Sequence, residues 1–138
     1  MTAKVVRAYA DQQMVAAGSN LTTAIITRIL ATTPDLSQRE LAVEMGVEAP
    51  TMARHMERLE ADGVVTRTRD RVDRRLLRVS LTDRGLELHR RLWKVSQHTN
   101  EQLSAAFTDQ ELTQFEASLD RIAAQASALL EREQEATG

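Results

Sequence analysis

The chain contains no cysteine, which excludes disulfides, cysteine nucleophiles and thiolate metal sites. Only four of its 138 residues are aromatic, so Leu, Ile, Val, Met and Ala must fill the core. No apolar run approaches membrane-spanning length and nothing resembles a signal peptide, so we expect a soluble cytoplasmic protein with no membrane partner. The length and the absence of linker-like segments predict a single domain, residues 1–138.

Sequence features of an enzyme are also missing. The three histidines fit no nucleophile or metal motif, and there is no glycine-rich phosphate loop. His89 and His98 are nine residues apart, about 180° around a helix, so only a metal site shared between subunits would use both. We therefore expect no enzyme, no cofactor and no metal site within one chain.

Positive charge is concentrated in one part of a chain whose net charge is −2. Residues 64–91 contain nine arginines and four acids, whereas residues 101–138 contain two arginines and eight acids. Separation on this scale suggests that one region meets a polyanion while another faces water or a partner. A solvated charged face would produce the same pattern, so charge alone does not decide.

Two short helices joined by a tight turn are predicted between residues 37 and 62. Ser37 and Glu40 have the spacing of a capping box, and Gly46 supplies the turn. The second helix, from about Ala49 to Asp62, has Pro50 in its first turn. Its apolar positions at i, i+4 and i+7 are Met52, Met56 and Leu59. Its opposite face carries Thr51, Arg54, His55 and Arg58. This arrangement predicts a helix-turn-helix.

An arginine-rich hairpin is predicted directly after these helices. Val64–Arg69 is expected to form one strand. In the other, Leu77, Val79 and Leu81 alternate with polar residues, as in a strand with one buried face. The connecting segment Asp70–Arg74 is a charged turn. A hairpin in this position is expected to be a wing.

Further helices are predicted on both sides, which makes the expected fold mainly α with a small β-hairpin. Lys4–Ala17 and Leu21–Thr32 precede the helix-turn-helix, and helices from Thr82 to about Ala106 and from about Asp109 to Glu131 follow the wing. The last helix has an apolar seam spaced 3, 4, 3, 4, 3, which comprises Leu112, Phe115, Leu119, Ile122, Ala126 and Leu129. A narrow heptad seam favours a coiled-coil partner, and we favour a homodimer over packing within the chain.

Between about Asn20 and Leu92 the chain resembles the MarR family of bacterial winged-helix transcription regulators. The resemblance lies in "LSQRELAVEMGV", "PTMARHMERLEADGVVTR" and "DRRLLRVSLTDRG", the last with D-x-R-x-x-R spacing at Asp73, Arg75 and Arg78. It implies a winged helix-turn-helix core, residues 20–82, flanked by dimerisation helices at 1–19 and 83–138. It also implies a homodimeric repressor on palindromic double-stranded DNA, released by a small lipophilic or aromatic effector whose binding residues are unknown.

DNA-contact residues follow from the same resemblance and from the exposed face of the second helix. They are Ser37, Gln38, Pro50, Thr51, Arg54, His55, Arg58, Arg69, Arg71, Arg74 and Arg75. Asp73 matches the family aspartate and would orient a wing arginine by a bidentate ion pair. In the family the recognition helix often starts with Ser followed by a basic residue, but these positions are Glu48 and Ala49 in this chain.

A winged helix can instead serve as a protein-interaction module, with an acidic partner bound to the arginine-rich wing. That alternative needs neither the polar face of the second helix nor a dimer. The sequence does not separate a ligand-responsive regulator from a constitutive one, and it does not separate a repressor from an activator.

Overall fold

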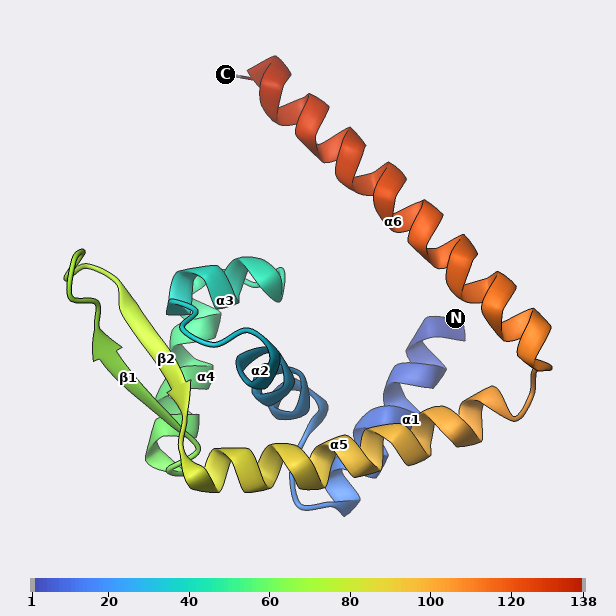
Figure 1. Cartoon of the computed structure of the whole chain (residues 1–138), viewed down its shortest axis with the longest axis horizontal. Helices are drawn as coiled ribbons and strands as arrows, with labels where there is room; N and C mark the ends of the chain where they lie inside the picture. Colours follow the sequence, from blue (N-terminus) through green and yellow to red (C-terminus); the bar gives the residue numbers. More distant parts are fainter. Residues whose placement is uncertain (1, 138) are drawn as a thin grey trace. The chain divides into compact units, whose positions relative to one another are not determined.

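The computed structural model describes the backbone of residues 2–137 and the side chains of residues 4–133. Over this range the order of elements is α1 (Thr2–Ala16), α2 (Leu21–Thr32), α3 (Gln38–Glu44), α4 (Ala49–Ala61), β1 (Val65–Arg69), β2 (Leu77–Leu81), α5 (Asp83–Ser104) and α6 (Asp109–Thr137). The fold is mainly α with a small antiparallel hairpin, as predicted (Figure 1). The chain groups into two compact units, Met1–Thr99 and Asn100–Gly138.

The helix-turn-helix is delimited by local capping interactions. Ser37 N donates to Glu40 Oε2 over 2.7 Å and Glu40 N donates to Ser37 Oγ over 3.2 Å, so the predicted capping box is confirmed. After α3 and α4 the chain turns at Gly46 and Gly63, whose φ angles are +62° and +69°. A left-handed conformation costs glycine nothing, so both helices end where the sequence places glycine.

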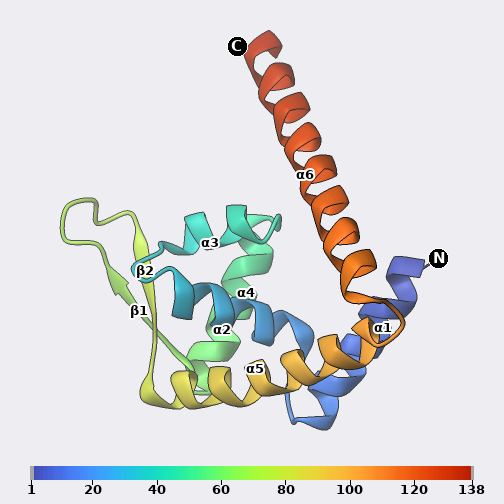
Figure 2. The same cartoon turned by 45° about the vertical axis from the view of Figure 1, so that its right-hand side comes forward.

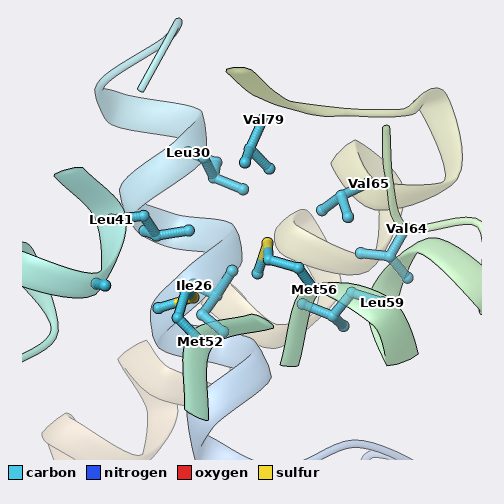
Figure 3. Close-up of a cluster of buried hydrophobic side chains, with 10 residues drawn as sticks. Ile26, Leu30, Leu41, Met52, Met56, Leu59, Val64, Val65 and Val79 are labelled. Atoms are coloured by element: carbon cyan, nitrogen blue, oxygen red, sulfur yellow. The ribbon is translucent and has the colours of Figure 1, made fainter. Parts of the chain in front are cut away.

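The core of the first unit lies between α2, α3, α4 and the base of the hairpin. Its side chains converge in Figure 3 and comprise Ile26, Leu30, Leu41, Ala42, Met52, Met56, Leu59, Val64, Val65 and Val79. In α2 the buried stripe contains Ile26 and Leu30 together with Thr23 and Thr27, whereas Ile25 is 41% exposed.

The hairpin is attached to the helix-turn-helix through backbone bonds. β1 and β2 pair from Val65↔Leu81 to Arg69↔Leu77, and Val79 is the fully buried residue of β2. Val79 N donates to Leu36 O over 2.9 Å, just before α3 begins. The base of the wing therefore shares a hydrogen-bonded edge with the segment that leads into the helix-turn-helix.

Helix α5 starts in close contact with the end of α4. Thr82 Oγ1 donates to Gly63 O over 2.6 Å and accepts from Gly85 N over 3.0 Å. A Cβ built on Gly85 would lie 2.1 Å from Val64 O, so only glycine allows this approach. No single helix among residues 2–137 is long and apolar enough to cross a membrane, although α1 from Lys4 and α2, bent by 82°, pass that test of length and composition as a pair.

The second unit contains α6 and the turn that precedes it. Thr108 and Glu111 form a capping box, in which Thr108 N donates to Glu111 Oε2 and Glu111 N donates to Thr108 Oγ1. Phe107 and Phe115 stack with ring centroids 6.0 Å apart. The helix continues to Thr137, beyond its predicted end at Glu131, because the following residues are good helix formers with no Pro or Gly among them.

Candidate nucleic-acid interface

The predicted recognition helix is α4, and its polar face lies at the surface. The apolar stripe of Met52, Met56 and Leu59 is buried in the core. On the other side, Arg54 and Arg58 are exposed, while Thr51 and His55 are half-buried. Pro50 lies exposed in the first turn. The helix therefore presents hydrogen-bonding side chains on the face opposite to its core contacts.

His55 is an uncharged member of this face at neutral pH. Burial lowers its pKa, and the cationic neighbours Arg58 and Arg54 lower it further. A neutral imidazole carries one hydrogen-bond donor and one acceptor. His55 can therefore donate to or accept from a base edge without adding charge.

At the N-terminus of α3, the two residues predicted to contact DNA make contacts within the protein. Ser37 is only 1% exposed, and its hydroxyl accepts from Glu40 N, so this side chain serves as a helix cap. Gln38 is half-buried and its Oε1 accepts from Arg67 Nη1 over 3.3 Å. Their contact with DNA stays a prediction.

The tip of the wing carries unpaired positive charge. Residues 70–76 connect β1 to β2, and Arg71 and Arg74 are exposed there on either side of Val72, which is 96% exposed. Neither arginine side chain forms an ion pair or hydrogen bond within residues 4–133. These two guanidinium groups are therefore free to meet an external anion.

Asp73 forms the bidentate ion pair expected of it, and its partner is Arg75. Arg75 Nε and Nη2 lie 3.0 and 3.1 Å from the two carboxylate oxygens. This contact holds the pKa of Asp73 below its usual range and raises that of Arg75. The pair is solvent-exposed, so its effect is to orient the Arg75 side chain rather than to stabilise the fold strongly.

Two other arginines of β1 are engaged in internal contacts. Arg67 Nη2 donates to Glu60 Oε2 over 2.6 Å, which ties the start of the wing to the last turns of α4. Arg69 Nη1 donates to the carbonyl oxygen of Arg74 over 2.9 Å and so supports the turn from within. Arg69 was predicted as a DNA contact, and that role stays a prediction.

A polar network that joins the wing to the segment before α3 involves Arg78 and was not predicted. Arg78 Nε donates to Asp70 Oδ2 over 2.7 Å, and Nη1 donates to Asp35 O over 2.7 Å and to Glu40 Oε2 over 3.3 Å. The other oxygen of Asp70 accepts from the amides of Val72 and Asp73, each over 2.8 Å. The bond from Arg78 is the main reason that the pKa of Asp70 falls to about 2.

This network could have been found from the hairpin register. Arg69 pairs with Leu77 and Thr68 with Arg78, so Asp70 and Arg78 are diagonal neighbours across the strands. Opposite charges at diagonal positions interact within reach of long side chains. The contacts to α3 could not be predicted in this way, because they depend on how the wing packs.

The second unit presents the predicted heptad seam. Phe115, Leu119, Ile122 and Leu129 are exposed in the single chain, and Leu112 is half-buried. Ala126 is also exposed. Among the residues whose side chains are described, no group of three or more His, Asp or Glu is arranged to hold a metal ion.

Sequence comparison with known proteins identifies the family that the motifs indicated. The sequence model of the MarR family matches residues 20–76. The homoprotocatechuate degradative operon repressor of Escherichia coli is 31% identical over 99 residues, which span 72% of this chain and 67% of that repressor. The relatives are transcriptional regulators and not enzymes.

Solved structures extend the likeness to the fold. The PcaV transcriptional regulator from Streptomyces coelicolor, in complex with its natural ligand, is 29% identical with a TM-score of 0.70, over 78% of this chain and 77% of PcaV. The transcriptional repressor CouR, bound to a 23-mer DNA duplex, is 22% identical with a TM-score of 0.82, over 88% and 87% of the two chains, a likeness of fold alone. This chain therefore belongs to the MarR family of transcriptional regulators.

Proposed function

We propose that the protein is a homodimeric, sequence-specific repressor that binds a palindromic operator and releases it when a small aromatic or lipophilic effector binds. The observation that carries this proposal is the pair of unpaired arginines at the wing tip, Arg71 and Arg74. The wing tip and the N-terminal end of α4 lie at the same end of the first unit (Figures 1 and 2). One duplex can therefore meet both elements.

Each element suits a different groove of DNA. The planar, weakly hydrated heads of Arg71 and Arg74 fit a narrow minor groove of strong negative potential. The exposed face of α4 suits the major groove, where Arg54 would contact guanine O6 and N7, with Thr51 and His55 beside it. Charges that contact only phosphate would position the protein, and every neutralised phosphate makes binding more sensitive to salt.

The exposed apolar seam of α6 supports a homodimer. Phe115, Leu119, Ile122 and Leu129 follow a heptad spacing and are exposed in one chain. A second α6 would remove these side chains from water. A two-fold dimer would also present two recognition helices to half-sites about 34–36 Å apart, one turn of DNA.

A small cavity between α1, α2 and α5 supports an effector. It is lined by Met14, Arg28, His89 and Trp93, among others, and has a volume of about 60 Å³. The Arg28 guanidinium lies 4.8 Å from the centre of the Trp93 ring. Burial lowers the pKa of His89, and Arg28 lowers it further, so the cation of this cavity at neutral pH is the arginine. An aromatic acid could stack on Trp93 while its carboxylate pairs with Arg28.

The size of this cavity suggests how an effector would act. Benzene occupies a cavity of about 150 Å³ in a protein core, so an aromatic ligand must widen the space between α2 and α5. A ligand shifts an equilibrium only when it binds one state better than the other. Widening would favour a different placement of the winged helix, and hence a different spacing of the two recognition helices.

The experiment that tests the proposal is fluorescence anisotropy with the DNA upstream of the protein's own gene, across a salt series and with an unrelated duplex as control. Preference for the upstream DNA and a steep salt dependence are expected. A monomeric mass in solution with no DNA affinity would instead favour the protein-interaction module. Because Trp93 is the only tryptophan, quenching of its fluorescence by aromatic acids tests the effector site separately.

A further inference from the structure

A second, larger cavity lies in the first unit, away from the wing tip. It has a volume of about 750 Å³ and is bounded by the start of α2, the last turns of α4 and the first half of α5. In Figures 1 and 2, α4 runs from α3 towards α5, so this cavity lies at the C-terminal end of the helix, where Arg58 belongs both to the cavity wall and to the predicted DNA-contact face. The cavity also differs from the aromatic one, since the two have no lining residue in common.

Charged side chains that lack partners line this cavity. Arg58 comes from α4 and Arg84 and Arg91 come from α5, with the carboxylates of Asp62 and Glu87 beside them. None of the five side chains forms an ion pair or a hydrogen bond within the described side chains, residues 4–133. Three guanidinium groups around one hollow, with a net lining charge of +1, provide fork-shaped donors for an oxyanion.

A hydroxyl at the cavity wall adds a further donor. Thr23 lines the cavity, and its hydroxyl makes no hydrogen bond within residues 4–133. Because no fully buried side-chain oxygen or nitrogen among the described residues lacks a partner, this hydroxyl reaches solvent and is open to a ligand. The N-terminal amides of α2 do not carry the proposed site, because two of them already have acceptors. Thr23 N donates to Asn20 Oδ1, and Leu21 N donates to Asp11 Oδ1.

We propose that this cavity is a binding site for a small oxyanion, a phosphate or carboxylate group, held by Arg58, Arg84, Arg91 and the Thr23 hydroxyl. The ligand would link the last turns of α4 to α5, since its donors come from both helices. It would thus stabilise one placement of the recognition helix through its C-terminal end. The site shares only Arg58 with the predicted DNA contacts and no residue with the proposed effector cavity.

Titration of the full-length protein without DNA tests the site independently of operator binding. The probes are inorganic phosphate and succinate, each added at constant ionic strength and followed by calorimetry and thermal unfolding. With one probe about tenfold above its dissociation constant, we expect the melting temperature to rise by about 3–5 °C. Phosphate alone would indicate a phosphate ligand and succinate alone a carboxylate ligand. Saturable binding of neither probe would overturn the proposal.

Matched variants locate the binding. Arg91→Gln should weaken it by about tenfold, as expected for one lost charge-assisted hydrogen bond, whereas Arg90→Gln on the same helix and Arg74→Gln at the wing should bind as the parent does. Equal loss in Arg90→Gln, or loss only in Arg74→Gln, would overturn the proposal. Should Arg91→Gln fold poorly, ¹⁵N NMR of the parent protein gives the same decision, since the shifts must centre on Thr23 and Arg58.

Discussion

Replacement of Gly85 by alanine is expected to destabilise the protein, although helix propensity alone predicts the opposite. In an exposed helix interior, Gly→Ala stabilises by about 1 kcal/mol. Gly85 is instead buried at the start of α5, where an added Cβ would lie 2.1 Å from Val64 O and 3.1 Å from Leu81 Cδ2. The first of these distances is more than about 1 Å shorter than an ordinary van der Waals contact.

The magnitude follows from what must move. The clashing atom is a backbone carbonyl, and the first turn of α5 is fixed to it through Thr82, whose hydroxyl bonds to Gly63 O and Val64 O. Overpacking a well-ordered contact costs about 1–3 kcal/mol, and a backbone clash belongs near the upper end. The gain in helix propensity, about 1 kcal/mol, offsets part of this cost. Gly85→Ala should therefore destabilise the protein by about 2 kcal/mol, which lowers the melting temperature by about 6–8 °C.

Urea and thermal unfolding followed by circular dichroism measure this effect. Gln97→Ala is the matched control, because Gln97 is exposed on the same helix, and its stability should stay within about 0.5 kcal/mol of the parent. A Gly85→Ala protein as stable as the parent, or more stable, would refute the close approach of α5 to Val64.

Three further predictions concern the wing, the seam and pH. Arg74→Ala should weaken operator binding and lower the salt slope by about one, measured by anisotropy, and an unchanged slope would remove Arg74 from the contacts. Leu119→Asp should convert the proposed dimer to monomer in sedimentation equilibrium, because it places a charge in the apolar seam, and an intact mutant dimer would count against that seam. The bond from Arg78 and those from the amides of Asp73 and Val72 lower the pKa of Asp70 from 3.8 to about 2, so their stabilisation is complete above about pH 5 and is lost progressively as pH falls through the folded value of about 2. In Asp70→Asn, the free energy of unfolding should therefore fall less steeply between about pH 5 and pH 2 than in the parent. An equally steep fall would contradict the lowered pKa of Asp70.

Local signals predicted the framework of the DNA-binding unit well. The capping box of Ser37 and Glu40 and the turn at Gly46 depend on residues within a few positions of each other, so the sequence pattern specified them directly. The bidentate contact of Asp73 with Arg75 is equally local.

Contacts between elements were not predictable in the same way. Arg67 and Arg78 looked like equivalent members of a basic cluster, yet they bond to Glu60 and to Asp35 in other parts of the chain. The packing of the wing against α3 and α4 decides which arginines form internal ion pairs and hydrogen bonds. The number of arginines in a segment gives no information on that packing. Ser37 shows the same difficulty, since its residue type fits both a helix cap and a phosphate contact.

The division of the wing into anchored strands and a free tip has a consequence for recombination between related regulators. Arg78, bonded to Asp70, fastens the strands to the segment before α3, whereas Arg71, Val72 and Arg74 have no side-chain partners in the rest of the described chain. The tip can therefore be replaced without changing the contacts that hold the rest of the wing. Chimeras that keep Asp70 and Arg78 should fold as the parent does while acquiring the DNA preference of the donor loop.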